Sequence, residues 1–282
     1  MSLKSSHAAQ LGFIQGRLSP IVDGKIQAFP WQHWREEFPI AHEIGLRKIE
    51  WTLDQDRLHE NPFIEKKARG EVKSLLSEFG MRIPSITGDC FMQFPFFKAF
   101  GNERLKLLDD LNRVIEAAED FGSQYIVFPL VDNGSITTEA EQDILLEEFQ
   151  SLRRKLVESG VKIIFESDFS PEKLRDFIGL FPVDAYGINY DLGNSASLGY
   201  DINEEFRFYY DRIDNIHIKD RLKGGTTVPL GSGNANFKAF FSLIREFEYK
   251  GNLIFQTARD PNNQHQSALK RYIDFVLAGL ES

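Results

Sequence analysis

The sequence predicts a single (β/α)₈ barrel, and three observations support this. The chain has 282 residues, near the ~250 residues of one such barrel. Short β-rich segments alternate with longer amphipathic ones, the pattern of βα units around a parallel sheet. The alternation repeats eight times with no Pro/Gly/Ser linker. We therefore expect one domain over residues 11–282, preceded by a disordered tail over residues 1–10.

The predicted strands are rich in β-branched and aromatic residues and end at turn residues. They cover Leu11–Gly16, Lys48–Leu53, Arg82–Asp89, Tyr125–Val131, Lys162–Ser167, Tyr186–Leu192, Asp214–Asp220 and Leu253–Ala258. A doubly wound open sheet would show the same alternation. However, Gly12 and Gly16 in the first strand are wrongly spaced for the G-x-G-x-x-G fingerprint of that fold.

The helices between these strands have readable ends. Several are followed by a glycine, which supplies the left-handed residue that terminates a helix. One begins at Ser170-Pro171, a cap residue followed by proline at the first helical position. The sixth unit, Asp201–Arg212, is short and crowded with aromatic residues. The other predicted helices are Trp31–Ile44, Ile64–Phe79, Asn102–Phe121, Thr138–Ser159, Pro171–Gly179, Phe237–Tyr249 and His265–Leu280.

Composition excludes several classes of protein. The formal net charge is −9, from 33 Lys and Arg against 42 Asp and Glu, so we expect no nucleic-acid partner. The single cysteine, Cys90, excludes an internal disulfide and a structural zinc site built on cysteine pairs. No apolar run approaches the ~18 residues of a membrane span, and the first ten residues lack the apolar core of a signal peptide. We expect a cytoplasmic protein without a membrane partner.

Four consecutive predicted strands end in polar side chains. Glu166, Asp191, His217 and Gln256 lie near the carboxyl ends of the fifth to eighth strands. These ends meet at one rim of a barrel, so the side chains are expected to share a site. Oxygen ligands with one imidazole suit a divalent ion, Mn²⁺, Mg²⁺ or Zn²⁺. Taken singly, each residue is better explained as a strand-end residue that hydrogen-bonds adjacent loops, and it is the four together that favour a shared site.

These segments together resemble the xylose-isomerase-like barrels, which include sugar and sugar-phosphate isomerases and epimerases. The resemblance implies that Glu166, Asp191 and His217 bind a divalent metal. The family's second metal-binding Glu falls on Gln256, and a His that usually follows the Asp falls on Asn194. The resemblance is carried by Gly12–Pro20, Lys25–Pro30, Ile49–Trp51, Phe165–Ser167, Asp191–Asn194, Ile216–Asp220 and Val228–Gly233.

The resemblance implies a metal-dependent sugar or sugar-phosphate isomerase that works through an enediolate. Gln256 cannot accept a proton at neutral pH, which disfavours inversion by two carboxylates. Glu166 is then both ligand and base, with Asp89 as a reserve base or a loop-capping carboxylate. Lys219 either stabilises the developing oxyanion or forms a salt bridge to Glu166 or Asp191. The alternatives are a non-catalytic sugar-binding barrel and a keto-polyol dehydratase.

The rim supplies candidate substrate contacts. Arg221, Lys223, Arg259 and Arg17 are the cations expected there, with Asn194 beside them. The glycine-rich loop 221–233 leads into a helix, an arrangement that suits phosphate, although its glycines are also explained by tight turns.

Aromatic residues are also expected at the rim. Trp51 and the Phe-rich segment after the third strand are expected to form an apolar wall for a sugar. Alternatively, that segment packs a loop onto its own helix or onto a neighbouring subunit. If Phe91–Phe100 is exposed, it predicts a homo-oligomer.

Overall fold

Eight parallel strands form a closed barrel in the order β1 to β8, which confirms the predicted fold class. The computed structural model describes residues 7–282. Strand β1 closes the ring on β8 through Leu11 and Leu253, and β4 pairs with β5 along their full length. The strands are β1 (Leu11–Ile14), β2 (Ile49–Thr52), β3 (Ser85–Thr87), β4 (Tyr125–Leu130), β5 (Lys162–Ser167), β6 (Tyr186–Asp191), β7 (Ile213–Ile218) and β8 (Asn252–Phe255).

Helices follow the strands as predicted, with differences at some of their starts and ends. The first begins late because residues 31–36 form turns, and α3 and α7 were not predicted. Glycines at positions 122, 160 and 199 end α4, α5 and α7 with positive φ. The helices are α1 (Glu37–Glu43), α2 (Arg69–Phe79), α3 (Asp89–Gln93), α4 (Gly101–Phe121), α5 (Glu139–Ser159), α6 (Pro171–Gly179), α7 (Leu192–Leu198), α8 (Ile202–Tyr209), α9 (Phe237–Glu246) and α10 (His265–Glu281).

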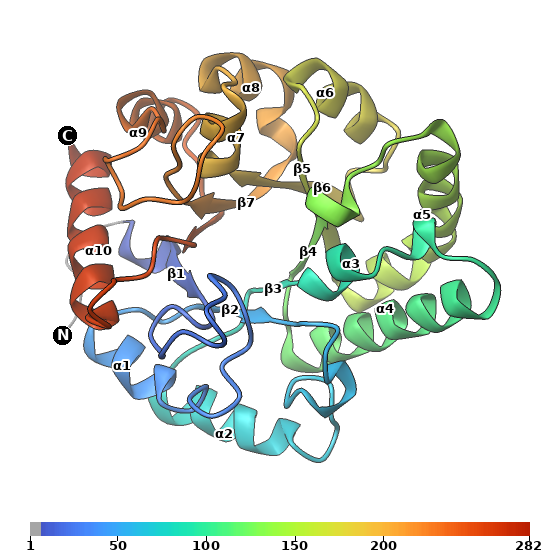
Figure 1. Cartoon of the computed structure of the whole chain (residues 1–282), viewed down its shortest axis with the longest axis horizontal. Coiled ribbons are helices and arrows are strands. Elements are labelled where there is room, and N and C mark those ends of the chain that lie inside the picture. The colour runs from blue at the N-terminus through green and yellow to red at the C-terminus, as the bar shows by residue number, and fades with distance from the viewer. Residues whose placement is uncertain (1–6) are drawn as a thin grey trace. The chain divides into compact units, whose positions relative to one another are not determined.

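Two compact units make up the chain. The first comprises Met1–Glu50, Leu75–Arg82 and Tyr190–Ser282, and the second comprises Trp51–Ser74 and Ile83–Asn189. In the first unit α9 lies beside α10 (Figure 1). The ring of Phe275 meets those of Phe237 and Phe241. That the whole chain is one domain stays a prediction.

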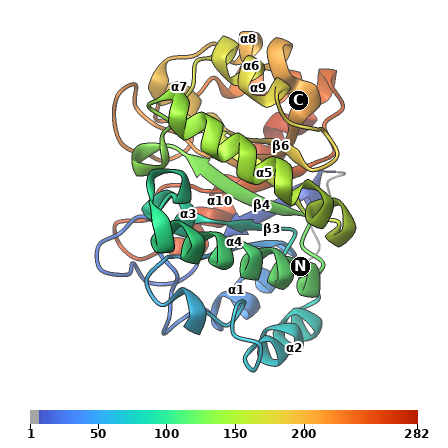
Figure 2. The same ribbon diagram turned by 90° about the vertical axis from the view of Figure 1, so that its right-hand side faces the viewer.

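Phenylalanine builds the core of the second unit. Helices α4 and α5 lie side by side over β4 (Figure 2). Between strands and helices, the ring of Phe149 contacts those of Phe128, Phe165 and Tyr186 at centroid distances of 5.2 to 5.7 Å. Such edge-to-face and offset-stacked pairs bury large apolar areas. Several of the chain's 25 phenylalanines therefore serve packing in this layer.

The last three residues of the predicted disordered tail form a regular element. Residues 1–6 lie outside the described part of the chain, but Ala8–Gln10 form a 3₁₀ helix, η1, directly before β1. The Gln10 amide donates hydrogen bonds to the carbonyls of Tyr249 and Gly251, 2.8 and 3.1 Å away. These bonds fasten the segment before the first strand to the one before β8. Within residues 7–282, no helix is both long and apolar enough to cross a membrane.

Candidate active site

Asp191 ends β6 and has a buried side chain, 1% exposed. Its Oδ1 accepts a hydrogen bond from the backbone N–H of Asn194 at 2.8 Å and thereby caps α7. Its Oδ2 lies 3.1 Å from Nζ of Lys219. The two oxygens thus have different tasks, one holding a helix and the other facing a cation.

The Lys219 ammonium group donates hydrogen bonds to oxygens of three residues of the predicted site. Besides Asp191, its Nζ donates to Oδ1 of Asn194 at 3.1 Å and to Oε1 of Gln256 at 3.0 Å. Arg221 donates to the same Asn194 oxygen at 2.9 Å. Asn194 and Gln256 therefore supply neutral oxygens that accept bonds from cations. Of the alternatives for Lys219, the ion pair with Asp191 is present in the structure.

His217 lies in β7 with a fully buried ring. Its Nε2 is 2.7 Å from Oε1 of Glu50, and its Nδ1 is 3.9 Å from Oδ2 of Asp191. Glu50, in β2, also accepts a hydrogen bond from Asn215 at 3.2 Å. The role of Glu50 was not predicted. The available signal was a charged residue inside the short, wholly buried strand Ile49–Thr52.

Glu166 belongs to the second unit and lies near the end of β5, with 7% of its surface exposed. Its Oε2 accepts a hydrogen bond from Nδ2 of Asn189, which lies in β6, at 2.8 Å. This bond holds the carboxylate in one orientation. The residue that sequence reasoning places in the role of base is therefore buried and fixed by a neighbouring strand.

The structure places two other candidates of the second unit differently from expectation. Trp51 is fully buried in the layer between strands and helices, where its ring stacks on Phe63 and its Nε1 donates to Asn61. It is not a wall of the mouth, because alternation along β2 turns it away from the face of Glu50. Asp89 does not end a strand but begins α3, and its carboxylate accepts a bond from Thr87.

The Phe-rich segment after β3 is mostly core. Phe91 stacks on Phe128, and Phe96 packs against Phe128 and Phe149. Only Phe94 and Phe100 in this segment are exposed, at 53% and 79%. The segment therefore packs onto its own barrel, as the first of its alternatives stated.

Arg17 and Arg259 hold loops together. Arg17 donates from Nε to the carbonyl of Thr257 and from Nη1 to that of Ile26, both at 2.9 Å. Arg259 donates to the carbonyl of Ser19, and burial lowers its pKa to about 10. Both guanidinium groups thus tie the loop after β1 to the segment after β8.

Glu37, at the start of α1, also holds the loop that follows β1. Its carboxylate accepts hydrogen bonds from the backbone N–H groups of Gly16 and Leu18 at 3.0 and 2.9 Å. Burial raises its pKa to about 7, although these bonds and the charge of Arg259 act in the opposite direction.

Asp220 occupies the place where the glycine-rich loop was expected to receive phosphate. Its buried carboxylate accepts hydrogen bonds from the backbone N–H groups of Gly231, Gly233 and Ala235 at 2.9, 2.8 and 3.0 Å. A Cβ at Gly233 would lie 2.3 Å from Oδ1 of Asp220, so only glycine fits there. Lys223 is exposed. These glycines form a tight turn around a carboxylate, which was the alternative explanation.

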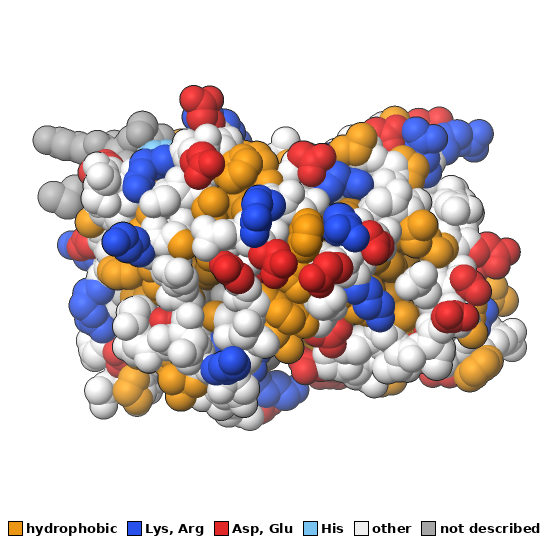
Figure 3. All heavy atoms as spheres, turned by 90° about the horizontal axis from the view of Figure 1, so that it is seen from above, with side chains coloured by type: hydrophobic (Ala, Val, Ile, Leu, Met, Phe, Trp, Pro, Cys, Tyr) orange, Lys and Arg blue, Asp and Glu red, His pale blue; other side chains and the backbone are white. Residues whose placement is uncertain are grey.

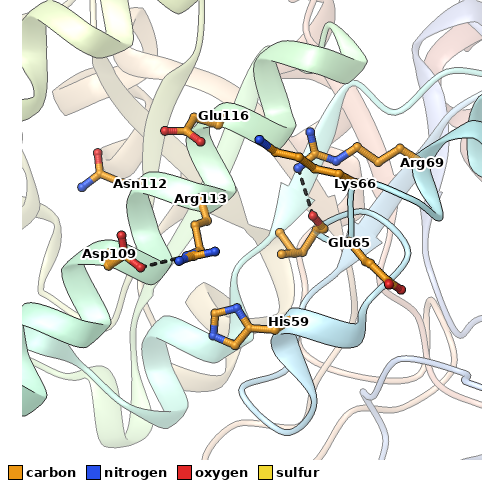
Figure 4. Close-up of a pocket in the computed structure, with 9 residues that line it drawn as sticks. His59, Glu65, Lys66, Arg69, Asp109, Asn112, Arg113 and Glu116 are labelled. Atoms are coloured by element: carbon orange, nitrogen blue, oxygen red, sulfur yellow. Dashed lines mark hydrogen bonds and ion pairs between the residues drawn. The ribbon is translucent and has the colours of Figure 1, made fainter.

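A separate cavity of about 380 Å³ lies on the helix side of the second unit (Figure 4). Charges of both signs line it, and several are paired: Arg113 with Asp109 at 2.8 Å and His59 with Asp110 at 3.0 Å. On the face seen in Figure 3, basic and acidic side chains are likewise interspersed. Neither this cavity nor this face therefore favours a ligand of a particular charge.

Comparisons with known proteins agree with the fold. The family model described as "Xylose isomerase-like TIM barrel" matches residues 38–275. The chain is 25% identical over 251 residues to a putative L-ribulose-5-phosphate 3-epimerase, SgbU, of Haemophilus influenzae, covering 82% of this chain and 86% of that protein.

Two solved structures share the architecture and show the fold alone. D-psicose 3-epimerase of Clostridium cellulolyticum H10, with D-tagatose, has a TM-score of 0.74 at 10% identity, covering 96% of this chain and 99% of that one. A xylose isomerase-like TIM barrel protein of Mycobacterium smegmatis, in complex with magnesium, has a TM-score of 0.69 at 20% identity, covering 99% and 100%.

Proposed function

The chain belongs to the xylose isomerase-like TIM barrel family, and from that premise we propose that it is a metal-dependent sugar isomerase. The proposed reaction removes a proton beside a carbonyl, passes through an enediolate and returns the proton to the adjacent carbon. The putative epimerase SgbU, similar over most of this chain, supports the reaction class.

One observation carries the proposal: within the first unit, Nδ1 of His217 lies 3.9 Å from Oδ2 of Asp191, and we propose Glu166 of the second unit as the third ligand. All three side chains are buried. Two carboxylates and one imidazole suit Mg²⁺, Mn²⁺ or Zn²⁺, so the residues fit a divalent ion. The magnesium in the M. smegmatis structure supports this choice of ion class.

The chain's own residues supply the proton transfer. A bound divalent ion would polarise the carbonyl of the substrate. Glu166, oriented by Asn189, is the proposed base that takes the proton and returns it to the neighbouring carbon. Lys219 places a positive charge beside Asp191 and Gln256, where it would stabilise negative charge on a substrate oxygen. Gln256 is the proposed neutral ligand, which gives the site one carboxylate fewer than the family pattern.

The rim favours a neutral substrate end over a phosphate. The loop N–H groups that would bind phosphate already donate to Asp220. Arg17 and Arg221 are engaged with backbone carbonyls, of Thr257 and Gly225 respectively. The proposed substrate is accordingly a free keto- or aldo-sugar, bound through its hydroxyl groups.

Two measurements on one preparation test the proposal. Crystals grown with Mn²⁺ should give an anomalous peak at Glu166, Asp191 and His217, and candidate ketoses incubated in D₂O should incorporate deuterium beside the carbonyl. Glu166→Gln should reduce the exchange by roughly 10²- to 10⁴-fold, the range for removal of a general base. Near-normal exchange in Glu166→Gln would exclude it as the base. Metal binding without exchange of any sugar would identify a non-catalytic binding protein.

A further inference from the structure

Glu50 is a fully buried carboxylate in the barrel interior. A charge in such a place is costly unless it is paired and hydrogen-bonded. Its Oε1 is 2.7 Å from Nε2 of His217, and its Oε2 accepts a hydrogen bond from Asn215. Asn215 and His217 are two residues apart on β7, so they share the face that meets Glu50. Two side chains of one strand therefore converge on this carboxylate.

The contact determines which ring nitrogen carries the proton. A carboxylate only accepts hydrogen bonds, so Nε2 of His217 donates to Glu50; in the neutral ring that a metal ion requires, Nδ1 then keeps its lone pair. Nδ1 faces Oδ2 of Asp191 at 3.9 Å. In that state Nδ1 of His217 and Oδ2 of Asp191 are both acceptors, a pair suited to share a cation.

We infer that Glu50 is a positioning residue of the proposed metal site. It holds His217 as the Nε2–H tautomer with Nδ1 turned towards Asp191, and its negative charge makes the imidazole a better ligand. Glu50 acts on the ion only through His217. The metal part of this inference rests on the proposed function, whereas the tautomer follows from the Glu50–His217 contact alone.

The first test concerns the wild-type protein without metal. Nitrogen-15 NMR of labelled histidine distinguishes the Nε2–H from the Nδ1–H tautomer, and His217→Gln identifies the signal among the six histidines. We expect His217 as the Nε2–H tautomer. An Nδ1–H tautomer would overturn the inference, and this result does not depend on any variant's folding.

The second test measures Mn²⁺ affinity by calorimetry, without substrate. Glu50→Gln should weaken Mn²⁺ binding by roughly 10- to 100-fold, the range for loss of a partner behind a metal-binding His. Glu37→Gln is the matched control: the same change at another fully buried carboxylate, one that bonds the N–H groups of Gly16 and Leu18. Its Mn²⁺ affinity should stay within about twofold of wild type, since Glu37 does not contact His217.

The outcomes distinguish the positioning role of Glu50 from the proposed metal site. A folded Glu50→Gln protein with wild-type Mn²⁺ affinity and an unchanged His217 tautomer would overturn the role of Glu50. Wild-type protein that binds no Mn²⁺ would instead overturn the proposed metal site, while the NMR measurement would still decide whether Glu50 sets the tautomer.

Discussion

Replacing Asp220 by Asn should destabilise the protein strongly, although the two side chains have the same shape. In the wild type, Oδ2 accepts from Gly231 and Gly233, and Oδ1 accepts from Ala235. An amide offers one oxygen, so its NH₂ group would face at least one of these N–H donors. A hydrogen bond to a charged group is worth ~1.5–3 kcal/mol, and an unsatisfied buried donor costs about as much.

The expected loss is the sum of these effects. One bond is lost outright and two are weakened, which gives about 3 kcal/mol in the free energy of unfolding. For a chain of this size each kcal/mol lowers Tm by ~2–4 °C, so the melting temperature should fall by roughly 6–12 °C. Urea denaturation and thermal melting measure both quantities. Hydrogen exchange at the Gly231, Gly233 and Ala235 amides should accelerate in parallel.

The matched control is Asp201→Asn, at the exposed cap of α8 where Asp201 accepts from the Asn203 N–H. Asn is as good a cap as Asp, so the control should change stability by less than about 0.5 kcal/mol. A loss below about 1 kcal/mol for Asp220→Asn would refute the reasoning, because three buried charge-assisted bonds cannot be that weak in sum.

Gln256→Glu should tighten Mn²⁺ binding about tenfold, since a carboxylate 3.0 Å from Lys219 adds a negative charge to the site; unchanged affinity by calorimetry would argue that residue 256 is not a ligand. Glu37 should make stability depend on pH. Its pKa of about 7 lies above its value in the unfolded chain, so its stabilising contribution is complete below about pH 4 and is lost as the pH rises to about 7. Between pH 4 and pH 8, the free energy of unfolding should fall by about 3 kcal/mol more in the wild type than in Glu37→Gln, as measured by urea denaturation. Parallel curves of this free energy against pH for the two proteins would contradict the assignment.

Local signals in the sequence were enough to predict most elements. Strand β5 and helix α6 have the predicted bounds. Both signals are local: an apolar run marks the strand, and Ser170 followed by Pro171 marks the start of the helix. Helix α1 was predicted too long. Residues 31–36 have the apolar pattern of a helix but form turns, through which Trp34 packs into the core.

The residues of the candidate site that lie at strand ends could be predicted from the sequence. The contacts between distant segments that position them could not. Alternation along single strands was sufficient to select Asp191 and His217. The pairing of Glu50 with His217 joins residues 167 positions apart in the chain. Likewise, the fixed position of Trp51 depends on Asn61 and Phe63, which belong to the following loop. The hydrophobic periodicity of a single segment cannot predict contacts between residues that are distant in the sequence.

The helix cap on Asp191 restricts how this carboxylate can bind an ion. Oδ1 is committed to the first turn of α7, so a cation can take Oδ2 alone unless α7 gives up its cap, at a cost of about 1 kcal/mol. Monodentate coordination favours small ions with strict octahedral or tetrahedral preferences over the larger calcium, which commonly takes both oxygens of a carboxylate. In the proposed metal site, the cap that Asp191 provides to α7 would therefore favour a small divalent ion over calcium.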